Sequence, residues 1–366
     1  MTLDIMKKKV LVGLSGGVDS SVSAYLLKKQ GYEVISAFIL ISPPMLQDFF
    51  KQKKTITCPW SLDLRLARQV ASQLNIPFYI FDFSRNYEKA VLKNFISEYK
   101  KGSTPNPDVL CNQAIKFGQF LRIAQKVGAD YVATGHYAGK LKNCITRGKD
   151  KSKDQSYFLW KLDKNQIQKA IFPLSKLHKS EVRKIASQAK LPTASRPDSQ
   201  GICFLGQIKV QDFLSHQLKN KPGRIINNKN EILGEHQGLW RYTIGQKIAG
   251  LRFTGTSYAG KDIPLLYATR KNLLKNYLLV GPLASPELYS RQIAINQTNF
   301  GKFNPSQQTL CQIRYGQAPQ KCQVKMQKNS VVVVFEKQQR AVTIGQSLVV
   351  YQGDTLVGGG IIKSII

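Results

Sequence analysis

Short apolar runs alternate with segments of helical spacing over the first two hundred residues of the chain. The apolar runs predict strands at Val10–Leu14, Val34–Ile41, Pro77–Phe83 and Tyr131–Ala133, and the spacing predicts helices at Val22–Leu27, Leu62–Leu74, Tyr87–Lys100 and Ile115–Val127. This order is typical of a doubly wound α/β domain with a parallel sheet. Ligands of such sheets bind at the carboxyl ends of the strands, so the segment after the first strand is the first candidate site.

The pattern changes after Gly206. Turn signals and short mixed runs fill residues 207–285, and β-like runs spaced as in a small barrel follow. These runs are Ala294–Thr298, Leu310–Tyr315, Val331–Glu336, Ser347–Tyr351 and Gly360–Ile366. We therefore predict an α/β domain over residues 1–206, a small mixed domain over 207–285 and a β-barrel over 286–366, without an internal repeat.

The charged residues of the chain limit the classes of partner that it is expected to bind. The 54 basic and 22 acidic residues leave a formal charge of +32, which favours a polyanionic partner, although an acidic protein or a membrane surface would also fit. No apolar run reaches the roughly 18 residues of a membrane-spanning helix. The first strand begins too soon for a signal or transit peptide, so a cytoplasmic protein is expected. The six cysteines contain no C-x-x-C pair, which argues against zinc and iron–sulfur sites.

The segment Ser15–Ser20, Ser-Gly-Gly-Val-Asp-Ser, joins the first strand to the first helix. Glycines let an anion approach the backbone, and a helix N-terminus attracts negative charge. Asp19 or Ser20 is expected to cap this helix. The lysine of a Walker A loop and the third glycine of a dinucleotide fingerprint are missing. An ordinary turn is the alternative, but the segment resembles the PP-loop of ATP pyrophosphatases, which cleave ATP to AMP and pyrophosphate while adenylating a substrate.

Two segments carry cysteines of chemical interest. Pro105 and Pro107 predict a stiff, non-helical segment that presents Asp108 and Cys111 before the next helix. A cysteine near a helix N-terminus in a basic protein favours the nucleophilic thiolate, whereas a buried structural cysteine is the alternative. Cys203 lies between glycines in a segment expected to be mobile. Whether it meets Cys111 in space is open.

Further motifs follow in order along the whole chain: Asn106-Pro107-Asp108 with Cys111-Asn112, Ala133–Tyr137, Asp154–Leu159, Asp198–Gly206, Gly238–Gln246, Arg314-Tyr315 and Gly358–Gly360. Together with the segment at Ser15 they are similar to those of the tRNA-specific 2-thiouridylases. That family thiolates the wobble uridine of certain tRNAs with ATP and persulfide sulfur. The expected products are 2-thiouridine, AMP and pyrophosphate, after adenylation of the base.

The resemblance implies a role for each matching residue. Asp108 would be the acid/base, Cys111 the nucleophile and Cys203 the persulfide carrier. ATP would be bound by Gly13, Leu14, Ser15, Gly16, Gly17, Val18, Asp19 and Ser20 at its phosphates, and by Ile39 and Gly135 at the adenosine. Asn106, Pro107 and Asp108 would meet the target base, and tRNA would also contact His136, Lys153, Asp154, Gln155, Arg314, Tyr315 and Gln346. Mg²⁺ is expected to balance the phosphate charge, without a metal site built from protein ligands.

The implied partners are the anticodon loops of lysine, glutamate and glutamine tRNAs, and a sulfur-relay protein or cysteine desulfurase as donor. A monomer is expected. Direct attack by the persulfide and release of hydrosulfide by Cys111 both remain open.

This sequence departs from the family at some positions. Ser103 replaces a frequent arginine, Ile344 precedes Gly345-Gln346 where the family has proline, and Cys58 fits only loosely. Two rival functions are another PP-loop enzyme, such as an AMP-forming amide ligase or a different thiolase, and a non-catalytic RNA-binding protein. Packing roles are expected for Cys144, Cys311 and Cys322, and surface or helix-end positions for His178 and His236. Trp240–Tyr242 fits core packing or stacking on RNA.

Overall fold

The computed structural model describes residues 7–52, 60–198, 209–248, 265–327 and 330–366. Cys58 and Cys203, and the roles expected of them, lie outside the described residues. The chain forms two compact units. Unit 1 contains residues 1–92, 107–208 and 354–357, and unit 2 contains residues 93–106, 209–353 and 358–366. The predicted division into three domains remains a prediction.

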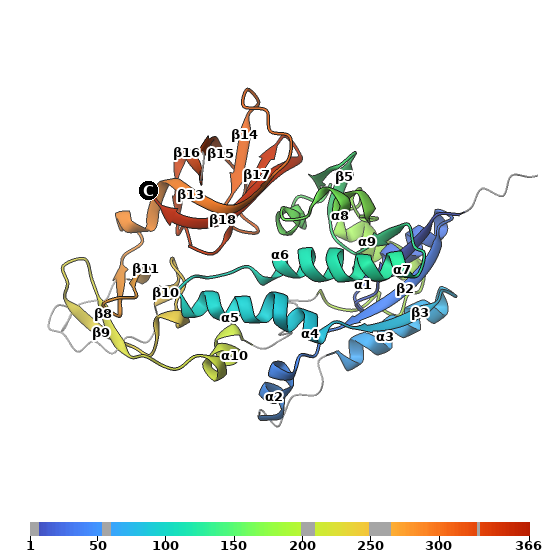
Figure 1. The fold of residues 1–366 in the computed structure, drawn as a ribbon, viewed down its shortest axis with the longest axis horizontal. Helices are drawn as coiled ribbons and strands as arrows, with labels where there is room; N and C mark the ends of the chain where they lie inside the picture. The colour runs from blue at the N-terminus through green and yellow to red at the C-terminus, as the bar shows by residue number, and fades with distance from the viewer. Residues whose placement is uncertain (1–6, 53–59, 199–208, 249–264, 328–329) are drawn as a thin grey trace, which may run out of the picture. The chain divides into compact units, whose positions relative to one another are not determined.

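Unit 1 is built on a five-stranded parallel sheet with the order β3-β2-β1-β4-β7. Two of its strands, β2 and β3, are labelled in Figure 1. The strands are β1 (Lys9–Gly13), β2 (Glu33–Leu40), β3 (Phe78–Asp82), β4 (Tyr131–Ala133) and β7 (Ala170–Ile171). The first four coincide with the predicted apolar runs. The chain moves from β1 outward to β3 and then returns to the other side of β1, which confirms the doubly wound α/β class.

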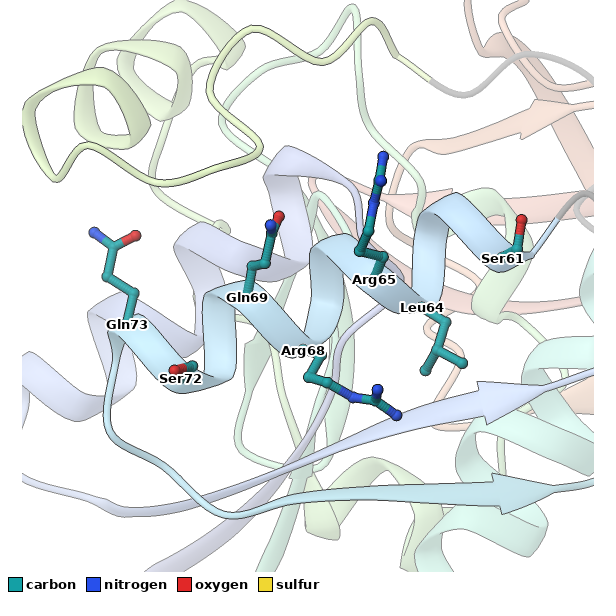
Figure 2. Close-up of a pocket in the computed structure, with 7 residues that line it drawn as sticks. All are labelled: Ser61, Leu64, Arg65, Arg68, Gln69, Ser72 and Gln73. Atoms are coloured by element: carbon teal, nitrogen blue, oxygen red, sulfur yellow. The ribbon is translucent and has the colours of Figure 1, made fainter.

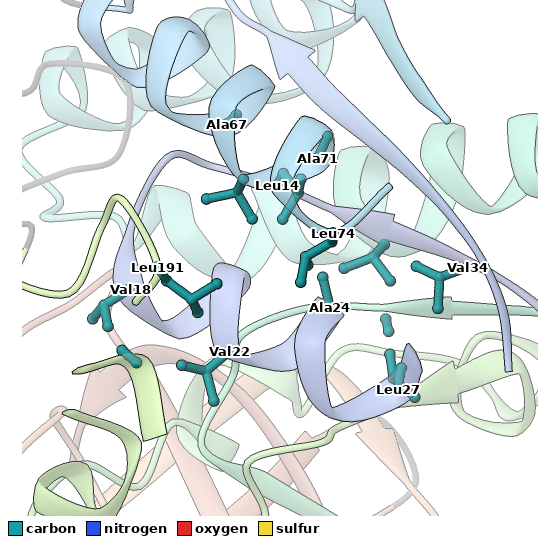
Figure 3. Close-up of a cluster of buried hydrophobic side chains, with 14 of the residues drawn as sticks. Leu14, Val18, Val22, Ala24, Leu27, Val34, Ala67, Ala71, Leu74 and Leu191 are labelled. Atoms are coloured by element: carbon teal, nitrogen blue, oxygen red, sulfur yellow. The ribbon is translucent and has the colours of Figure 1, made fainter. Parts of the chain in front are cut away.

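Three helices pack on the central strands of this sheet: α1 (Val18–Lys29), α3 (Ser61–Gln73) and α9 (Lys179–Gln188). Their apolar residues form one buried cluster with β1 and β2, in which Val10, Val22 and Val70 have no exposed surface. Figure 3 shows Val22 of α1 and Ala71 of α3 in this cluster. The cluster fixes the start of α1, and therefore the loop before it, against the sheet.

Proline begins two helices, one of them in the segment that the sequence predicted to be non-helical. Helix α2 (Pro44–Gln52) and helix α6 (Pro107–Cys111) both start at a proline, because the first turn does not need the missing N–H. The prediction of a non-helical segment is therefore wrong from Pro107 onward. Helix α6 continues through the π-helical segment Asn112–Gln119 into α7 (Phe120–Lys126).

The other predicted helix of unit 1 is confirmed in three parts: α4 (Ser84–Tyr87), the π-helical segment Glu88–Leu92 and α5 (Lys93–Lys100), the last of which belongs to unit 2. Two short strands, β5 (Ala138–Leu141) and β6 (Cys144–Arg147), form a hairpin in unit 1. Helix α8 (Lys164–Lys169) starts at a capping box formed by Asp163 and Gln166.

Unit 2 contains two sheets and helix α10 (Val210–Gln217). The smaller has the order β10-β11-β12-β8-β9, from β8 (Gly223–Ile226), β9 (Ile232–His236), β10 (Lys247–Ile248), β11 (Leu266–Asn272) and β12 (Tyr277–Gly281). Six strands of the larger sheet have the order β13-β16-β15-β14-β17-β18 and are closed into a barrel by pairing of β13 with β18. Its strands are β13 (Tyr289–Phe300), β14 (Thr309–Gln312), β15 (Gln320–Gln327), β16 (Ser330–Arg340), β17 (Ser347–Gln352) and β18 (Thr355–Ile365). The mixed segment and the barrel are thus as predicted.

The tetrapeptide Thr-Ile-Gly-Gln occurs twice, at 243–246 and 343–346, and folds into the same turn each time. In both, the glutamine N–H donates to the threonine carbonyl, and the glycine has a positive φ, +83° and +93°. Each turn then pairs with one later strand residue, Ala268 of β11 or Ile362 of β18, through the glycine N–H and the glutamine carbonyl. The two copies share only these four residues, so the expectation of no internal repeat stays a prediction.

Burial tests the remaining expectations from sequence. Cys311 and Cys322 are buried and Cys144 is partly buried, in agreement with packing roles. His178 is exposed and caps α9, as expected for a helix end. His236 is only 1% exposed, so its expected surface position is wrong, and burial lowers its pKa. No helix among the described residues has both the length and the apolar character to cross a membrane.

Candidate functional site

The loop Ser15–Ser20, called the phosphate loop below, connects β1 to α1 in unit 1. Gly17 is the N-cap of α1, so the expected cap by Asp19 or Ser20 is wrong. Ser20 instead binds the loop itself: its Oγ accepts the Ser15 N–H at 3.1 Å and donates to the Gly17 carbonyl at 3.0 Å. A glycine N-cap has no side chain to bind the first-turn N–H groups, which leaves them directed at an anion.

Close backbone approaches explain two glycines of the site. Gly16 has φ +72°, and a Cβ there would lie 2.3 Å from the Asp63 carbonyl oxygen. Gly135, which follows β4, lies against the first turn of α1, and its Cβ would be 2.8 Å from the Ser20 nitrogen. The structure therefore brings Gly135 to the phosphate loop. Ile39, the other residue expected at the adenosine, is partly exposed near the end of β2, beside β1.

A charged network surrounds Asp19 in the first turn of α1. The Lys179 ammonium donates to both carboxylate oxygens of Asp19 at 2.7 and 2.8 Å, and the Tyr137 hydroxyl donates to Asp19 at 2.7 Å. Burial and the Asp19 charge raise the pKa of Tyr137 far above its usual range. Lys179, 15% exposed, thus places a cation beside a loop that lacks the Walker lysine.

The network extends to Asp198, the last described residue before the segment that contains Cys203. Three cations bind this carboxylate: Lys179 at 2.9 Å, Lys153 at 3.0 Å and Arg183 at 2.5 Å. Burial alone would raise the pKa of Asp198, but the hydrogen bonds from these cations outweigh it and hold the pKa well below its usual range. Asp198 is therefore linked to Asp19 of the phosphate loop through Lys179.

Arg196 completes the charged surroundings of the loop. Its guanidinium donates to the Gly16 carbonyl at 3.2 Å and pairs with Asp63 of α3. Sequence reasoning missed Lys179, Arg183 and Arg196, and it gave Asp198 no role of its own. Their chain distances from the loop leave no local spacing that could have revealed them; Lys179 and Asp19 are 160 positions apart.

Asp108 and Cys111 share the single turn of α6. Side chains three positions apart lie on the same face of a helix, so the two can act on one ligand. Asp108 is partly exposed, and Cys111 is 1% exposed. The next residue, Asn112, donates to the Phe158 carbonyl at 3.1 Å and begins the π-helical segment, a geometry often found at functional sites.

Several residues expected at the tRNA have structural contacts in unit 1. Asp154, 8% exposed, accepts hydrogen bonds from Arg147 at 2.7 Å and from the Gly148 and Ser156 N–H groups at 3.1 Å. The Gln155 side chain accepts the Tyr137 N–H at 3.0 Å. These contacts order the segment that carries Lys153, so it is Lys153 whose charge reaches the network around Asp198.

His136 is 8% exposed and lies near the rings of Phe117 and Phe172. Its Nδ1 is 2.6 Å from the Thr134 hydroxyl. Burial, with a contribution from nearby Lys116, lowers the pKa of His136 well below its usual value, which keeps the ring neutral. Its expected contact with tRNA remains a prediction.

The expected tRNA residues of unit 2 differ in exposure. Tyr315 is 43% exposed, and the Arg314 guanidinium donates to the Arg340 carbonyl. Gln346 uses its side-chain amide on the protein itself, donating to the carbonyls of Thr104 at 2.8 Å and Pro105 at 3.4 Å. Asn106 ends the unit 2 segment, and Pro107 begins the next segment of unit 1.

An open cavity of about 680 Å³ lies along α3 and is lined by Ser61, Leu64, Arg65, Arg68, Gln69, Ser72 and Gln73. Figure 2 shows Arg65 and Gln69 pointing to one side of the helix and Leu64 and Arg68 to the other. None of the residues predicted for catalysis or ATP binding lines it. Within the described ranges, no three His, Cys, Asp or Glu side chains form a metal site.

Three family models match the chain in succession. One described as tRNA methyl transferase HUP domain matches residues 8–207, one described as tRNA methyl transferase PRC-barrel domain matches 211–282, and one described as aminomethyltransferase beta-barrel domain matches 290–362. A solved structure of NMN synthetase from Francisella tularensis covers 53% of this chain and 66% of its own, with 19% identity and a TM-score of 0.33. A likeness that weak carries no argument about function.

Similar proteins of known name match over nearly their whole length. The tRNA-specific 2-thiouridylase MnmA of Mycoplasmopsis synoviae (strain 53) is 43% identical over 371 residues, which covers 98% of this chain and 96% of the relative. The protein of the same name from Streptococcus sanguinis (strain SK36) is 42% identical over 368 residues, with the same coverage. With the phosphate loop and the ordered motifs in place, these matches show that the chain belongs to the tRNA-specific 2-thiouridylase family of sulfurtransferase enzymes.

Proposed function

We propose that this protein thiolates the wobble uridine of tRNA at position 2, with ATP activating the base and a cysteine persulfide supplying the sulfur. The observation that carries the proposal is the phosphate loop, whose glycine-capped helix start lies beside Gly135 and the Asp19–Lys179 pair. The names of the relatives supply the substrate class. The proposed location is the cytoplasm.

The phosphate loop supports the activation step. The N–H groups at the start of α1 would bind the leaving pyrophosphate, and Lys179 would supply the positive charge that a Walker lysine gives elsewhere. Charge-assisted hydrogen bonds of this kind are roughly twice as strong as those between neutral groups. Mg²⁺ would balance the phosphate charge of the bound ATP.

The sulfur step needs the two cysteines. Attack of the uracil C2 oxygen on the α-phosphate of ATP forms an adenylated base and releases pyrophosphate. The terminal sulfur of a persulfide on Cys203 then bonds to C2. The Cys111 thiolate attacks the Cys203 sulfur, the S–S bond breaks toward the base, and AMP leaves. The resulting Cys111–Cys203 disulfide requires an external thiol reductant. In the alternative order, Cys111 first frees hydrosulfide, which attacks C2.

The charge of the chain supports an RNA partner. A formal charge of +32 favours a polyanion, and Lys153 and exposed Tyr315 are suited to phosphate contact and base stacking. We propose lysine, glutamate and glutamine tRNAs as acceptors and a sulfur-relay protein or cysteine desulfurase as donor, acting on a monomer. The wobble base would leave the anticodon stack to reach Asp108, the proposed acid/base.

The proposal is tested with purified protein, ATP, an unmodified tRNA transcript and a protein persulfide donor. AMP release and 2-thiouridine are measured together, the second by mass spectrometry of digested tRNA. The wild type should release AMP only with tRNA and should form 2-thiouridine. Cys203→Ser should lose persulfide-driven thiolation, while the matched variant Cys144→Ser, a partly buried cysteine of β6, should keep it.

Two results would overturn the proposal or part of it. If AMP release does not depend on tRNA, the chain is not a tRNA-activating enzyme. If Cys203→Ser thiolates as fast as the wild type, the sulfur carrier is another residue.

A further inference from the structure

The loop Gly102–Asn106, called the lead-in loop below, precedes the helix with Asp108 and Cys111, and its contacts come from distant parts of unit 2. At its start, the Lys271 ammonium of β11 donates to the Gly102 carbonyl at 2.9 Å. Leu273 lies so close that a Cβ on Gly102 would be 2.8 Å from its side chain. The small sheet therefore holds the first residue of the loop.

Thr104, in the middle of the loop, contacts both Thr-Ile-Gly-Gln turns. Its N–H donates to the Ile344 carbonyl at 2.9 Å, and its carbonyl accepts the Gln346 amide at 2.8 Å. Its hydroxyl is 3.4 Å from the hydroxyl of Thr243 in the other turn. Thr104 is 9% exposed, so these contacts replace solvent. Thr104 is thus the one residue of the lead-in loop that these contacts join to both turns.

The two turns lie close to the lead-in loop and to the barrel. Gly345 approaches the loop so closely that a Cβ there would lie 2.9 Å from the Ser103 Cβ and 3.0 Å from the Thr104 nitrogen. A Cβ on Gly245 would lie 2.3 Å from the Ala341 Cβ, which places the first turn against the barrel segment that leads into the second. Each turn is also hydrogen-bonded to a strand of its own sheet, as described above.

We propose that Gln346 is a positioning residue, which with Thr243 fixes Thr104 and Pro105 and thereby sets the place of Asn106 within unit 2. This inference rests on the proposed function, because the resemblance expects Asn106 and Asp108 to meet the target base. It differs from a role of Gln346 in binding RNA, since the amide is already used on two loop carbonyls. Through the two copies of the turn, the small sheet and the barrel both contact Thr104 of the lead-in loop.

The test compares Gln346→Ala with the matched variant Gln352→Ala in the full chain. Gln352 is also a barrel glutamine whose amide donates to two backbone carbonyls, those of Asn304 at 2.6 Å and Gln307 at 3.5 Å, away from the lead-in loop. Three quantities are measured: hydrogen exchange in peptides covering residues 102–106, affinity for an unmodified tRNA transcript, and AMP release at saturating tRNA.

For Gln346→Ala we expect exchange at the Thr104 amide to rise and saturated AMP release to fall, each by about fivefold to tenfold, as the loss of one hydrogen bond implies. The affinity for tRNA should stay within about twofold, because no RNA contact is lost. Gln352→Ala should leave exchange at residues 102–106 unchanged. Thr104→Val, which keeps the backbone bonds but removes the hydroxyl, should show a smaller effect of the same kind.

Unchanged exchange in Gln346→Ala would overturn the proposal, as would weaker tRNA binding with a normal rate at saturating tRNA. The exchange comparison requires no turnover. It therefore decides the role of Gln346 even if the wild type releases no AMP with tRNA and the proposed function fails.

Discussion

The phosphate loop and the lead-in loop solve the same problem, a fixed backbone, with different chemistry. The phosphate loop is surrounded by ions: Lys179 binds Asp19, and Arg196 binds the Gly16 carbonyl. The middle of the lead-in loop is held by neutral groups, a glutamine amide and backbone hydrogen bonds at Thr104. Charge suits a loop that must bind an anion, whereas neutral contacts fix a backbone without attracting one.

The two loops also differ in how they should respond to solution conditions. Salt and pH act on charged contacts that water can reach, and much less on neutral buried hydrogen bonds. The phosphate loop should therefore be sensitive to ionic conditions and the centre of the lead-in loop should not. The following variants test that contrast.

The largest effect is expected at Gly16, with Gly128 as its matched control. Both glycines have nearly the same φ, +72° and +71°, but a Cβ on Gly16 meets the Asp63 backbone whereas nothing lies within 4 Å of one on Gly128. Gly128→Ala should cost roughly 1–2 kcal/mol of backbone strain. Gly16→Ala should cost roughly 1–3 kcal/mol more in unfolding free energy, and AMP release should fall by at least about 100-fold. Similar unfolding free energies for the two variants would contradict the crowding at Gly16.

Lys179→Met should give the next largest effect. The variant loses the ammonium that binds Asp19 and Asp198, so the affinity for ATP should fall by about tenfold or more, the range for a hydrogen bond to a charged group. Lys184→Met, at an exposed position of the same helix, is the control and should bind ATP normally. Calorimetric titration with ATP measures both. Equal affinities would mean that Lys179 only stabilises the fold.

The variant Asp198→Asn tests, through the pH dependence of stability, whether charged contacts stabilise the surroundings of the phosphate loop. Because the folded-state pKa of Asp198 lies below its ordinary value of 3.8, the carboxylate stabilises the fold above about pH 4. As the pH falls below 4 the unfolded chain takes up the proton first, and this contribution is lost. Denaturant unfolding at several pH values should show a wild-type advantage of about 1 kcal/mol at pH 7, modest because the side chain is one-third exposed, that shrinks toward pH 3. A constant difference would contradict the prediction.

The smallest effect is expected for Lys271→Met at the start of the lead-in loop. Burial lowers the pKa of Lys271 to about 8 from 10.5, so the unfolded chain holds more protons between these values. The stability of the wild type relative to the variant should therefore rise from pH 8 to about 10.5. At pH 7 the two should differ by about 1 kcal/mol or less, because methionine keeps the packing but loses one hydrogen bond. If the stability of the wild type relative to the variant falls over that pH window, the buried amine of Lys271 does not cause the pH dependence.

The sequence predicted four of the five strands of the α/β sheet because each of them is a continuous apolar run. The sequence did not predict β7, because two residues are too few to show a periodic pattern. It did not predict the starts of α2 and α6, because a proline in a sequence is more readily interpreted as the end of a helix than as its first residue. The repeated turn could not be predicted from sequence because a shared segment of four residues is too short to indicate a common structure.

The candidate site also has one part that the sequence predicts and another part that only the fold reveals. The phosphate loop is contiguous, so its residue types were enough to predict an anion site. The partners of Asp19 and Thr104 are 160 and 242 positions away, and only the fold brings them together. A resemblance could assign Gln346 to tRNA, but the direction of its amide toward a carbonyl depends on the packing of unit 2.

The membership of the lead-in loop in unit 2 bears on how the chain is made. Helix α5 and residues 101–106 leave the ribosome long before Lys271 and Gln346, which follow 169 and 242 positions after their partners. At ordinary rates of translation the second interval is roughly 10–50 s. Until Lys271 is synthesised, the segment just before Asp108 has none of these stabilising contacts, and until Gln346 is synthesised it lacks the hydrogen bond at Thr104. The nascent N-terminal half thus completes its phosphate loop early, and the approach to its proposed acid/base acquires its final geometry only when the last strands have been synthesised.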